Sequence, residues 1–422
     1  MDSKKIILIA RILNNIIAFL LVLSTGGLLF VFNRNISFLV LVLVVIFSLV
    51  YIGKGIKSSV YYSSLLSFLA VVGLFIINFS FAITPQSITK YLFFGIIIFT
   101  STLILFYFNN QDNKNTFISS LYFVLKLFLF HSLFNFVLYF FVKNDLFLIT
   151  SDFHESLTYN YLCYYSTKSG SLINLFGLEF QRNIGLFWEP GILQAYLNIL
   201  FFLEVTVFKR SRLLLVLIII AILLTYSTTG LMLLMIQIIY FLYYKFKKNI
   251  AVFLMILIGF PLYMLLSVNM NEKIYGEREL SFQKRLIDLT QPFFIALEHP
   301  ITGVGLDIEA LQKLREGFYI NYNINEILDK VGVQQKLETT SKAGTNSVMS
   351  VLASMGFPTT ILFLLMFIKQ KIITNHKLMW FVITFVSVMS EPLLFRPFFF
   401  ILIISGFYNF FYQIINHKKQ IA

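Results

Sequence analysis

Cysteine and charged residues are scarce in this sequence. A single cysteine, Cys163, is present among 422 residues, which excludes an internal disulfide and a cysteine-based metal cluster. Charged residues make up 13% of the chain, against about 25% in an average soluble domain. Apolar residues make up 58%, with 50 Phe and 22 Tyr among the aromatic ones. This composition excludes a disordered chain and an ordinary soluble enzyme.

Patterns that bind metal ions are also missing. The five histidines have no spacing typical of metal ligands, and no Asp-x-Asp pair occurs; the histidines are His131, His154, His299, His376 and His417. We therefore expect a protein that works with no metal and no cofactor.

Long apolar stretches dominate what is present. A membrane-spanning helix needs about 20 mostly apolar residues. Twelve stretches approach this pattern, near 13–33, 36–53, 61–83, 89–108, 117–142, 190–208, 213–226, 229–244, 250–268, 346–368, 376–390 and 393–415. The sequence predicts an all-α polytopic membrane protein with about twelve transmembrane helices. The short stretch 213–226 requires a tilted helix or a thinned bilayer.

The distribution of basic residues predicts the orientation of these helices. The net charge is +13, and the basic residues form short clusters between apolar stretches rather than one contiguous stripe. Lys54, Lys57, Lys209, Arg210 and Lys247 are examples on the side that also holds both termini. By the positive-inside rule this side is cytoplasmic. Topology thus accounts for the positive charge, and we expect no nucleic acid partner.

The predicted helices divide the chain into five consecutive parts. Residues 1–142 hold helices one to five, and 143–189 form a first large periplasmic loop. Residues 190–268 hold helices six to nine, and 269–345 form a second large periplasmic loop. Residues 346–422 hold helices ten to twelve and a cytoplasmic tail. Loops of this length are usually functional, and spacings of three and four predict amphipathic helices near 282–297 and 308–318.

The segment with the most candidate site residues leads into the sixth predicted helix. Pro190 suits the first turn of a helix and favours an extended Glu189 before it. Arg182 lies just upstream, and Gly185 and Gly191 permit close backbone approach. A helix N-terminus beside an arginine predicts a cradle for an anion such as phosphate. The alternative is an Arg182–Glu189 ion pair that only shapes the loop.

Arg285 is the second candidate ligand for an anion. It lies on the predicted helix 282–297, with Arg278 upstream, and the alternative for both is a solvated polar face. Ser227 begins the eighth predicted helix, where it either caps the helix or binds a polar substrate.

Two further positions complete the candidate set. Thr345 and Asn346 open the tenth predicted helix, where an N-cap is again the first explanation. Glu391 precedes Pro392 close to Arg396, which predicts an ion pair at that helix end. All the candidates fall on the predicted external side. That convergence indicates an anionic head group, and phosphate matches the planar fork of arginine.

Several of these segments resemble the sequence motifs of a known protein family. Arg182-x-x-Gly185-x-Phe187-x-Glu189-Pro190-Gly191 resembles the entry to a mid-chain helix of bacterial O-antigen polymerases. Similar segments are the Ser-rich turn Ser227-Thr228-Thr229-Gly230, then Arg285, Pro300-Ile301-x-Gly303-Val304-Gly305, and Asn346 with Gly356 and Thr359 beyond it. The resemblance spans roughly residues 182–396.

The resemblance implies a type C glycosyltransferase-like membrane protein of the O-antigen polymerase and ligase group. Such proteins transfer sugar chains from undecaprenyl pyrophosphate at the periplasmic face of the bacterial inner membrane, without a metal. Related ligases usually have His where this chain has Thr345, which favours a polymerase over a ligase. A lipid-linked oligosaccharide flippase is a further alternative, disfavoured because Lys126 is the one charge predicted well inside a helix. A chain-length regulator protein is an expected partner.

A mechanism follows from these assignments. We expect Arg182 and Arg285 to stabilise the leaving pyrophosphate. Glu189 is the predicted base for the acceptor hydroxyl, because it is the acid beside the Arg182 cradle. Substrate contacts are predicted at Gly185, Pro190, Gly191, Ser227, Arg278, Thr345 and Asn346.

Overall fold

The computed structural model describes residues 3–52, 55–111, 113, 115–145, 147–151, 154–161, 164–167, 172–175, 178–275, 279–321 and 344–421. In this part of the chain, ten helices are long and apolar enough to cross a membrane, and two shorter apolar helices accompany them. The ten lie in α1 (Ser3–Gly26), α2 (Leu28–Ile52), α3 (Ser58–Phe81), α4 (Ile88–Asn109), α5 (Thr116–Val142), α6 (Pro190–Leu203) with the π-helical turn Glu204–Phe208, α8 (Thr228–Lys245), α9 (Lys248–Tyr275), α13 (Ser347–Ile368) and α15 (Pro397–Ile421).

The shorter apolar helices are α7 (Arg212–Thr225) and α14 (Lys377–Ser390). The prediction of an α-helical polytopic membrane protein is confirmed. The helices expected between α9 and α13 are present as α10 (Glu279–Glu298) and α11 (Ile308–Asn321).

The exposed surface of the long helices is strongly apolar. On α9, Phe253, Ile256 and Leu257 are all exposed. A soluble protein rarely leaves contiguous apolar surface of this kind in water. In a membrane-spanning helix the same side chains face hydrocarbon, where their exposure carries no cost.

Short strands, which were not predicted, occupy part of the first long loop. A three-stranded antiparallel sheet contains β1 (Phe147–Ser151), β2 (His154–Tyr161) and β3 (Tyr164–Thr167). A two-stranded sheet pairs β4 (Leu172–Leu175) with β5 (Leu178–Gln181). Threonine and tyrosine are frequent in β2 and β3, and both residue types favour strands.

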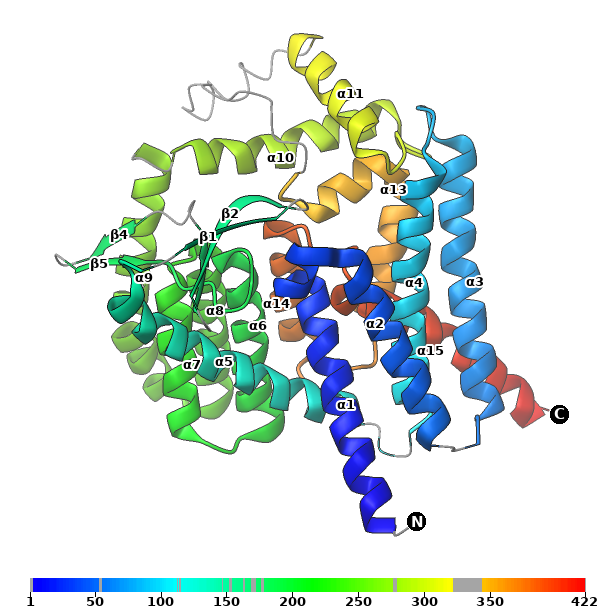
Figure 1. Cartoon of the computed structure of the whole chain (residues 1–422), viewed down its shortest axis with the longest axis horizontal. Coiled ribbons are helices and arrows are strands. Elements are labelled where there is room, and N and C mark those ends of the chain that lie inside the picture. The colour runs from blue at the N-terminus through cyan, green and yellow to red at the C-terminus, as the bar shows by residue number, and fades with distance from the viewer. Residues whose placement is uncertain are drawn as a thin grey trace. The chain divides into compact units, whose positions relative to one another are not determined.

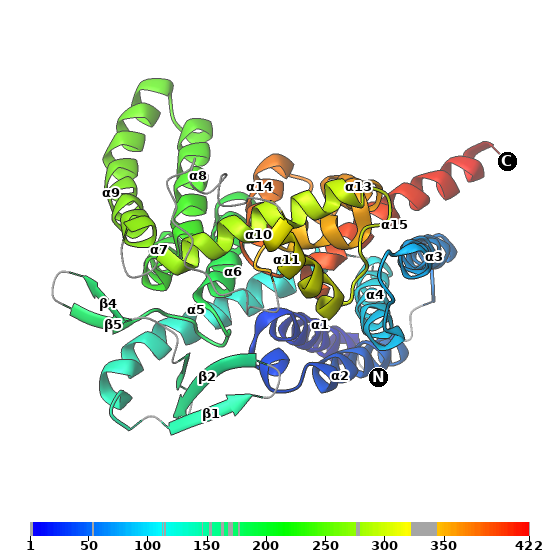
Figure 2. The same ribbon diagram turned by 90° about the horizontal axis from the view of Figure 1, so that it is seen from above.

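The chain forms two compact units, each built from separated segments. Unit 1 contains residues 1–55, 107–269 and 373–387. Its central helix is α6, in which every residue from Pro190 to Leu203 is buried. Helices α5, α7 and α8 pack against α6 and gather around it in Figure 2.

Unit 2 contains residues 56–106, 270–372 and 388–422. Helix α13 packs against α10 and α15, and α15 packs against α3. Figure 1 shows α10 lying across the end of α13 at which that helix begins. Ile295 of α10, Val304 and Ala353 of α13 form a buried apolar cluster between these elements.

The helical hydrogen bonding of α13 is interrupted at Gly356. The loop after α10 supplies partners for the backbone groups that this interruption leaves without a helical bond. Gly356 has φ 74° and ψ 175°, which is not helical. The N–H of Phe357 therefore donates to the carbonyl of Pro300 instead of to Ala353, at 2.8 Å. In return, the carbonyl of Ala353 accepts from Val304 N–H at 2.9 Å. Backbone groups released by the break are thus satisfied in pairs, as buried backbone requires.

Polar side chains from α3 and α4 add further hydrogen bonds at the interruption in α13. Pro358 has no N–H, so the carbonyl of Ser354 lacks a helical donor. It accepts instead from Gly305 N–H and from the Asn78 side chain, both at 2.9 Å. Tyr91 donates its hydroxyl proton to Asn78 Oδ1 at 2.5 Å. The segment Pro300–Gly305 is therefore a structural clasp around the break in α13.

Candidate functional site

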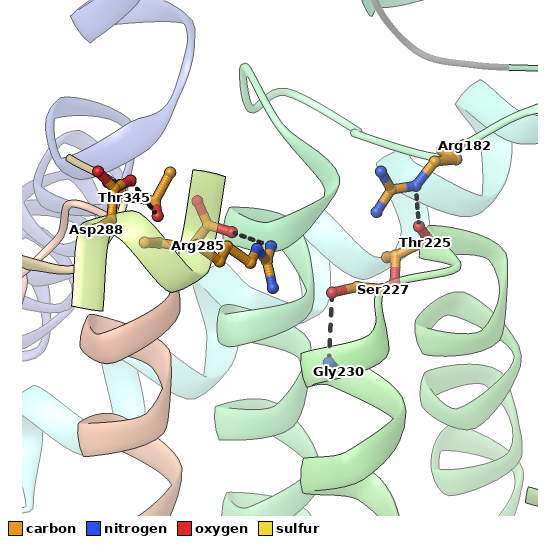
Figure 3. Close-up of polar contacts among 8 residues, drawn as sticks. Arg182, Thr225, Ser227, Gly230, Arg285, Asp288 and Thr345 are labelled. Atoms are coloured by element: carbon orange, nitrogen blue, oxygen red, sulfur yellow. Dashed lines mark hydrogen bonds and ion pairs between the residues drawn. The ribbon is translucent and has the colours of Figure 1, made fainter. Parts of the chain in front are cut away.

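Arg182 and Asn183 bind the end of α7. The guanidinium Nε of Arg182 donates to the carbonyl of Thr225 at 3.0 Å, as Figure 3 shows. The backbone N–H of Asn183 donates to the carbonyl of Leu224 at 3.0 Å. The last carbonyls of a helix have no partner within it and carry a partial negative charge, so an arginine is well placed there.

Tight packing fixes the path of the segment after Arg182. Asn183 is buried, and its amide donates to the carbonyl of Ser132 at 2.7 Å. Gly185 has φ 55°, and a Cβ there would lie 3.3 Å from Ser132 Cβ. This left-handed conformation and close approach favour glycine. Gly185 therefore shapes the backbone beside Arg182.

The start of α6 follows the local prediction. Pro190 is the first helical residue, and Glu189 before it is extended, with φ −143° and ψ 149°. Pro190 and Gly191 are buried, whereas Glu189 is exposed. Among the described residues, no ion pair joins Arg182 to Glu189.

Ser227 caps α8, as expected. Its hydroxyl oxygen accepts from the N–H of Gly230 at 3.4 Å, drawn in Figure 3. The turn before it is tight, since Tyr226 adopts a left-handed conformation with φ 46°. The amide of Asn269, near the end of α9, donates to the carbonyl of Tyr226 at 2.9 Å. Arg182, Thr225 and Ser227 thus meet at one end of unit 1.

Arg285 and Glu391 form an ion pair in unit 2. Arg285 Nη2 lies 4.0 Å from Glu391 Oε1 (Figure 3), and the side chains are 35% and 3% exposed. Ser347 at the start of α13 donates its hydroxyl proton to the carbonyls of Val388 and Glu391, at 2.5 and 3.1 Å. The backbone at Glu391 is therefore held in place and its side chain is buried, while Arg285 is partly accessible.

Asp288 lies one helical turn after Arg285 and is fully buried. Its Oδ2 accepts from the backbone N–H of Thr345 at 2.7 Å and from the Thr345 hydroxyl at 2.9 Å. Figure 3 shows the Asp288 carboxylate directed at Thr345. The next residue, Asn346, caps α13 by accepting from Met349 N–H at 3.1 Å. This cap was predicted from the sequence and is confirmed.

The predicted site residues are divided between the two units. Unit 1 holds Arg182, Gly185, Glu189, Pro190, Gly191 and Ser227, and unit 2 holds Arg285, Thr345 and Asn346. Arg278 lies outside the described residues. Asp288 was not among the predicted site residues, and Glu391 was expected to pair with Arg396. A spacing of three from Arg285 was the available signal for Asp288, since residues three apart share a helix face.

The fold defines a polytopic α-helical membrane protein with arginine-bearing polar clusters at helix ends. Residues 213–364 match a family model described as O-antigen ligase. The match runs from α7 into α13 and includes Arg285, Asp288, Thr345 and Asn346. It supports the resemblance to the O-antigen polymerase and ligase group. No curated protein sequence matches the chain significantly.

Proposed function

We propose that this protein is a surface-polysaccharide polymerase. It transfers a growing glycan from undecaprenyl pyrophosphate onto a lipid-linked repeat unit at the periplasmic face of the inner membrane. The observation that carries the proposal is the Arg285–Glu391 pair beside the Asp288–Thr345 pair, within the segment that matches the family model. A partly exposed arginine next to a hydroxyl suits a reaction that releases pyrophosphate and consumes a sugar hydroxyl.

Arg285 supplies positive charge that the leaving group needs. Pyrophosphate gains negative charge as the glycosidic bond breaks, and fixed donors aimed at that charge lower the barrier. Arg285 is suited to this role because its planar fork binds phosphate oxygens in pairs. Glu391 holds the side chain in place, which limits the reorganisation needed on binding. In unit 1, Arg182 is proposed separately as a phosphate ligand.

Replacing Arg182 with alanine is expected to abolish polymer while the protein still accumulates in the membrane. Removing one fixed donor to a developing anion typically lowers the rate by about 100- to 1000-fold. Arg182→Lys should restore activity in part, because lysine keeps the charge and loses the fork. Polymer length on gels and protein abundance by immunoblot check the result. A simple loss of abundance would assign Arg182 a structural role, through contacts such as the one with the carbonyl of Thr225.

The proposed orientation places both termini in the cytoplasm and α11 outside. Lys313 on α11 and Lys247 between α8 and α9 are both exposed and can be tested directly. After replacement of Cys163 by serine, Lys313→Cys should react with a membrane-impermeant thiol reagent in intact spheroplasts. Lys247→Cys should react only after permeabilisation. The reverse pattern would invert the topology.

The second candidate function is ligation of finished polymer to lipid A core. The family model's description favours it, whereas Thr345, in place of the histidine that related ligases have, favours the polymerase. Deleting the protein should leave single repeat units attached to the acceptor lipid, with long chains absent. Full-length polymer that accumulates on undecaprenyl pyrophosphate and never reaches the acceptor would identify a ligase.

A further inference from the structure

We propose that Thr345 and Asp288 form a proton relay that activates the acceptor hydroxyl. The inference rests on the proposed function and assigns a chemical role to a pair that the resemblance leaves without one. Thr345 is the catalytic residue in this proposal, because its hydroxyl contacts the acceptor. Asp288 is a positioning residue that acts through Thr345.

The hydrogen bonds of Thr345 determine which bonds it can form with a substrate. A threonine hydroxyl has one proton to donate and two lone pairs that accept. The Thr345 proton is directed at Asp288 Oδ2, at 2.9 Å. Toward any other partner the oxygen can therefore only accept. An acceptor sugar hydroxyl would then donate its own proton to Thr345, which is the geometry required for its removal.

The burial of Asp288 makes it suitable as the end of the relay. Its side chain is 0% exposed, and two of its hydrogen bonds come from the single residue Thr345. A buried carboxylate is costly unless donors hold its charge. The carboxylate is in direct contact with the Thr345 hydroxyl, so it is the group that can receive the proton of that hydroxyl. Thr345 is half-buried and connects Asp288 to the surroundings.

Arg285, the proposed ligand of the leaving pyrophosphate, lies close to the proposed relay on α10. Arg285 and Asp288 are three residues apart on α10, so they lie on the same helix face. The acid–hydroxyl pair and the proposed phosphate ligand are therefore adjacent within one unit. Glu189, the base predicted from the sequence, is exposed in unit 1 and makes no hydrogen bond with its carboxylate among the described residues.

The transfer step exchanges one bond at the anomeric carbon of the donor for another. The acceptor oxygen forms a bond to the anomeric carbon of the donor, and the bond from that carbon to the phosphate oxygen breaks. The bonding electron pair leaves with the pyrophosphate. The acceptor proton moves to Thr345 Oγ1 while the Thr345 proton moves to the Asp288 carboxylate. After product release the proton passes back through Thr345 to water.

Thr345→Val tests the proton relay apart from the structural role of Thr345, because it removes the hydroxyl and keeps the backbone bond to Asp288. Valine has the shape of threonine and keeps the backbone N–H that binds Asp288 at 2.7 Å. General bases contribute about 100- to 10,000-fold to rate. We expect kcat to fall by about 100-fold or more in Thr345→Val and in Asp288→Asn. Thr345→Ser should keep most of the rate, because serine retains the hydroxyl. KM for the donor should stay within about twofold of wild type, since Arg285 is unchanged.

The matched control is Thr290→Val on the same helix. The Thr290 hydroxyl donates to the carbonyl of Leu286 at 2.9 Å within α10, so its loss should leave kcat unchanged. All proteins are purified into nanodiscs and given lipid-pyrophosphate-linked oligosaccharide extracted from cells that lack the protein. Undecaprenyl pyrophosphate without sugar serves as the inhibitor that reports phosphate binding.

Three results would overturn the relay. Thr345→Val could turn over as fast as Thr290→Val, or Thr345→Ser could be as slow as Thr345→Val. Thr345→Val could also lose inhibition by undecaprenyl pyrophosphate together with its rate, which would assign the pair to structure. Each of these results leaves the proposed function intact. A wild-type protein that releases no pyrophosphate from this donor would instead refute the proposed function, and the relay with it.

Discussion

Replacing Arg285 with alanine is expected to reduce glycan transfer by about 100- to 1000-fold, or roughly 3–4 kcal/mol in the barrier. The change removes a charged donor that the Glu391 carboxylate holds in place at 4.0 Å. Arg285→Lys should recover only part of the rate, because a single ammonium cannot bind two phosphate oxygens in parallel. Initial rates of polymer formation by purified protein would measure the effect.

A matched change on the same helix tests whether the loss is specific. Lys284 is next to Arg285 on α10 and is partly exposed. Lys284→Ala alters the net charge by the same amount and should change the rate by less than about threefold, since scattered exposed charges contribute little. Equal losses in the two variants would show that overall charge matters and that Arg285 has no particular role.

Replacing Gly356 with alanine is expected to destabilise unit 2 severely. Gly356 has φ 74° and ψ 175°, a region almost restricted to glycine, which alone costs about 1–3 kcal/mol for another residue. A Cβ would also overlap the carbonyl group of Ile301 in the clasp, and backbone atoms cannot yield as a flexible side chain can. We expect a large fall in the thermal unfolding midpoint in detergent and low abundance in the membrane.

Gly73→Ala in α3 is the control for Gly356→Ala. A Cβ at Gly73 would meet no atom within 4 Å, and alanine favours helices over glycine by roughly 1 kcal/mol. This variant should be as stable as wild type or slightly more stable. If Gly356→Ala unfolds at the same temperature as Gly73→Ala, the clasp does not hold the broken helix as the hydrogen bonds indicate.

The elements that depend on local chemistry were predictable from the sequence. The length of the apolar stretches alone located the membrane helices, because the thickness of the hydrocarbon core sets a minimum number of consecutive apolar residues. Pro190 as the first residue of α6 and the caps by Ser227 and Asn346 were also predicted, since each acts on backbone within three residues.

Contacts between distant segments were not predictable in the same way. The Arg285–Glu391 pair joins α10 to the segment after α14, and periodicity carries no information about such a partner. The Pro300–Gly305 segment was noted only for its family resemblance, and its bonds to the carbonyls of the broken α13 were not predicted. The strands between α5 and α6 are short and carry no long apolar alternation, which hid them within a loop.

The most direct test of the polymerase proposal is glycan extension by the purified protein in proteoliposomes. The substrate is lipid-pyrophosphate-linked repeat unit extracted from cells that lack the protein, with Arg285→Ala as the inactive comparison. We predict a ladder of oligosaccharides that differ by one repeat unit, and one undecaprenyl pyrophosphate released for each bond formed. Oligosaccharide that remains at a single repeat unit, with no undecaprenyl pyrophosphate released, would contradict the proposed function.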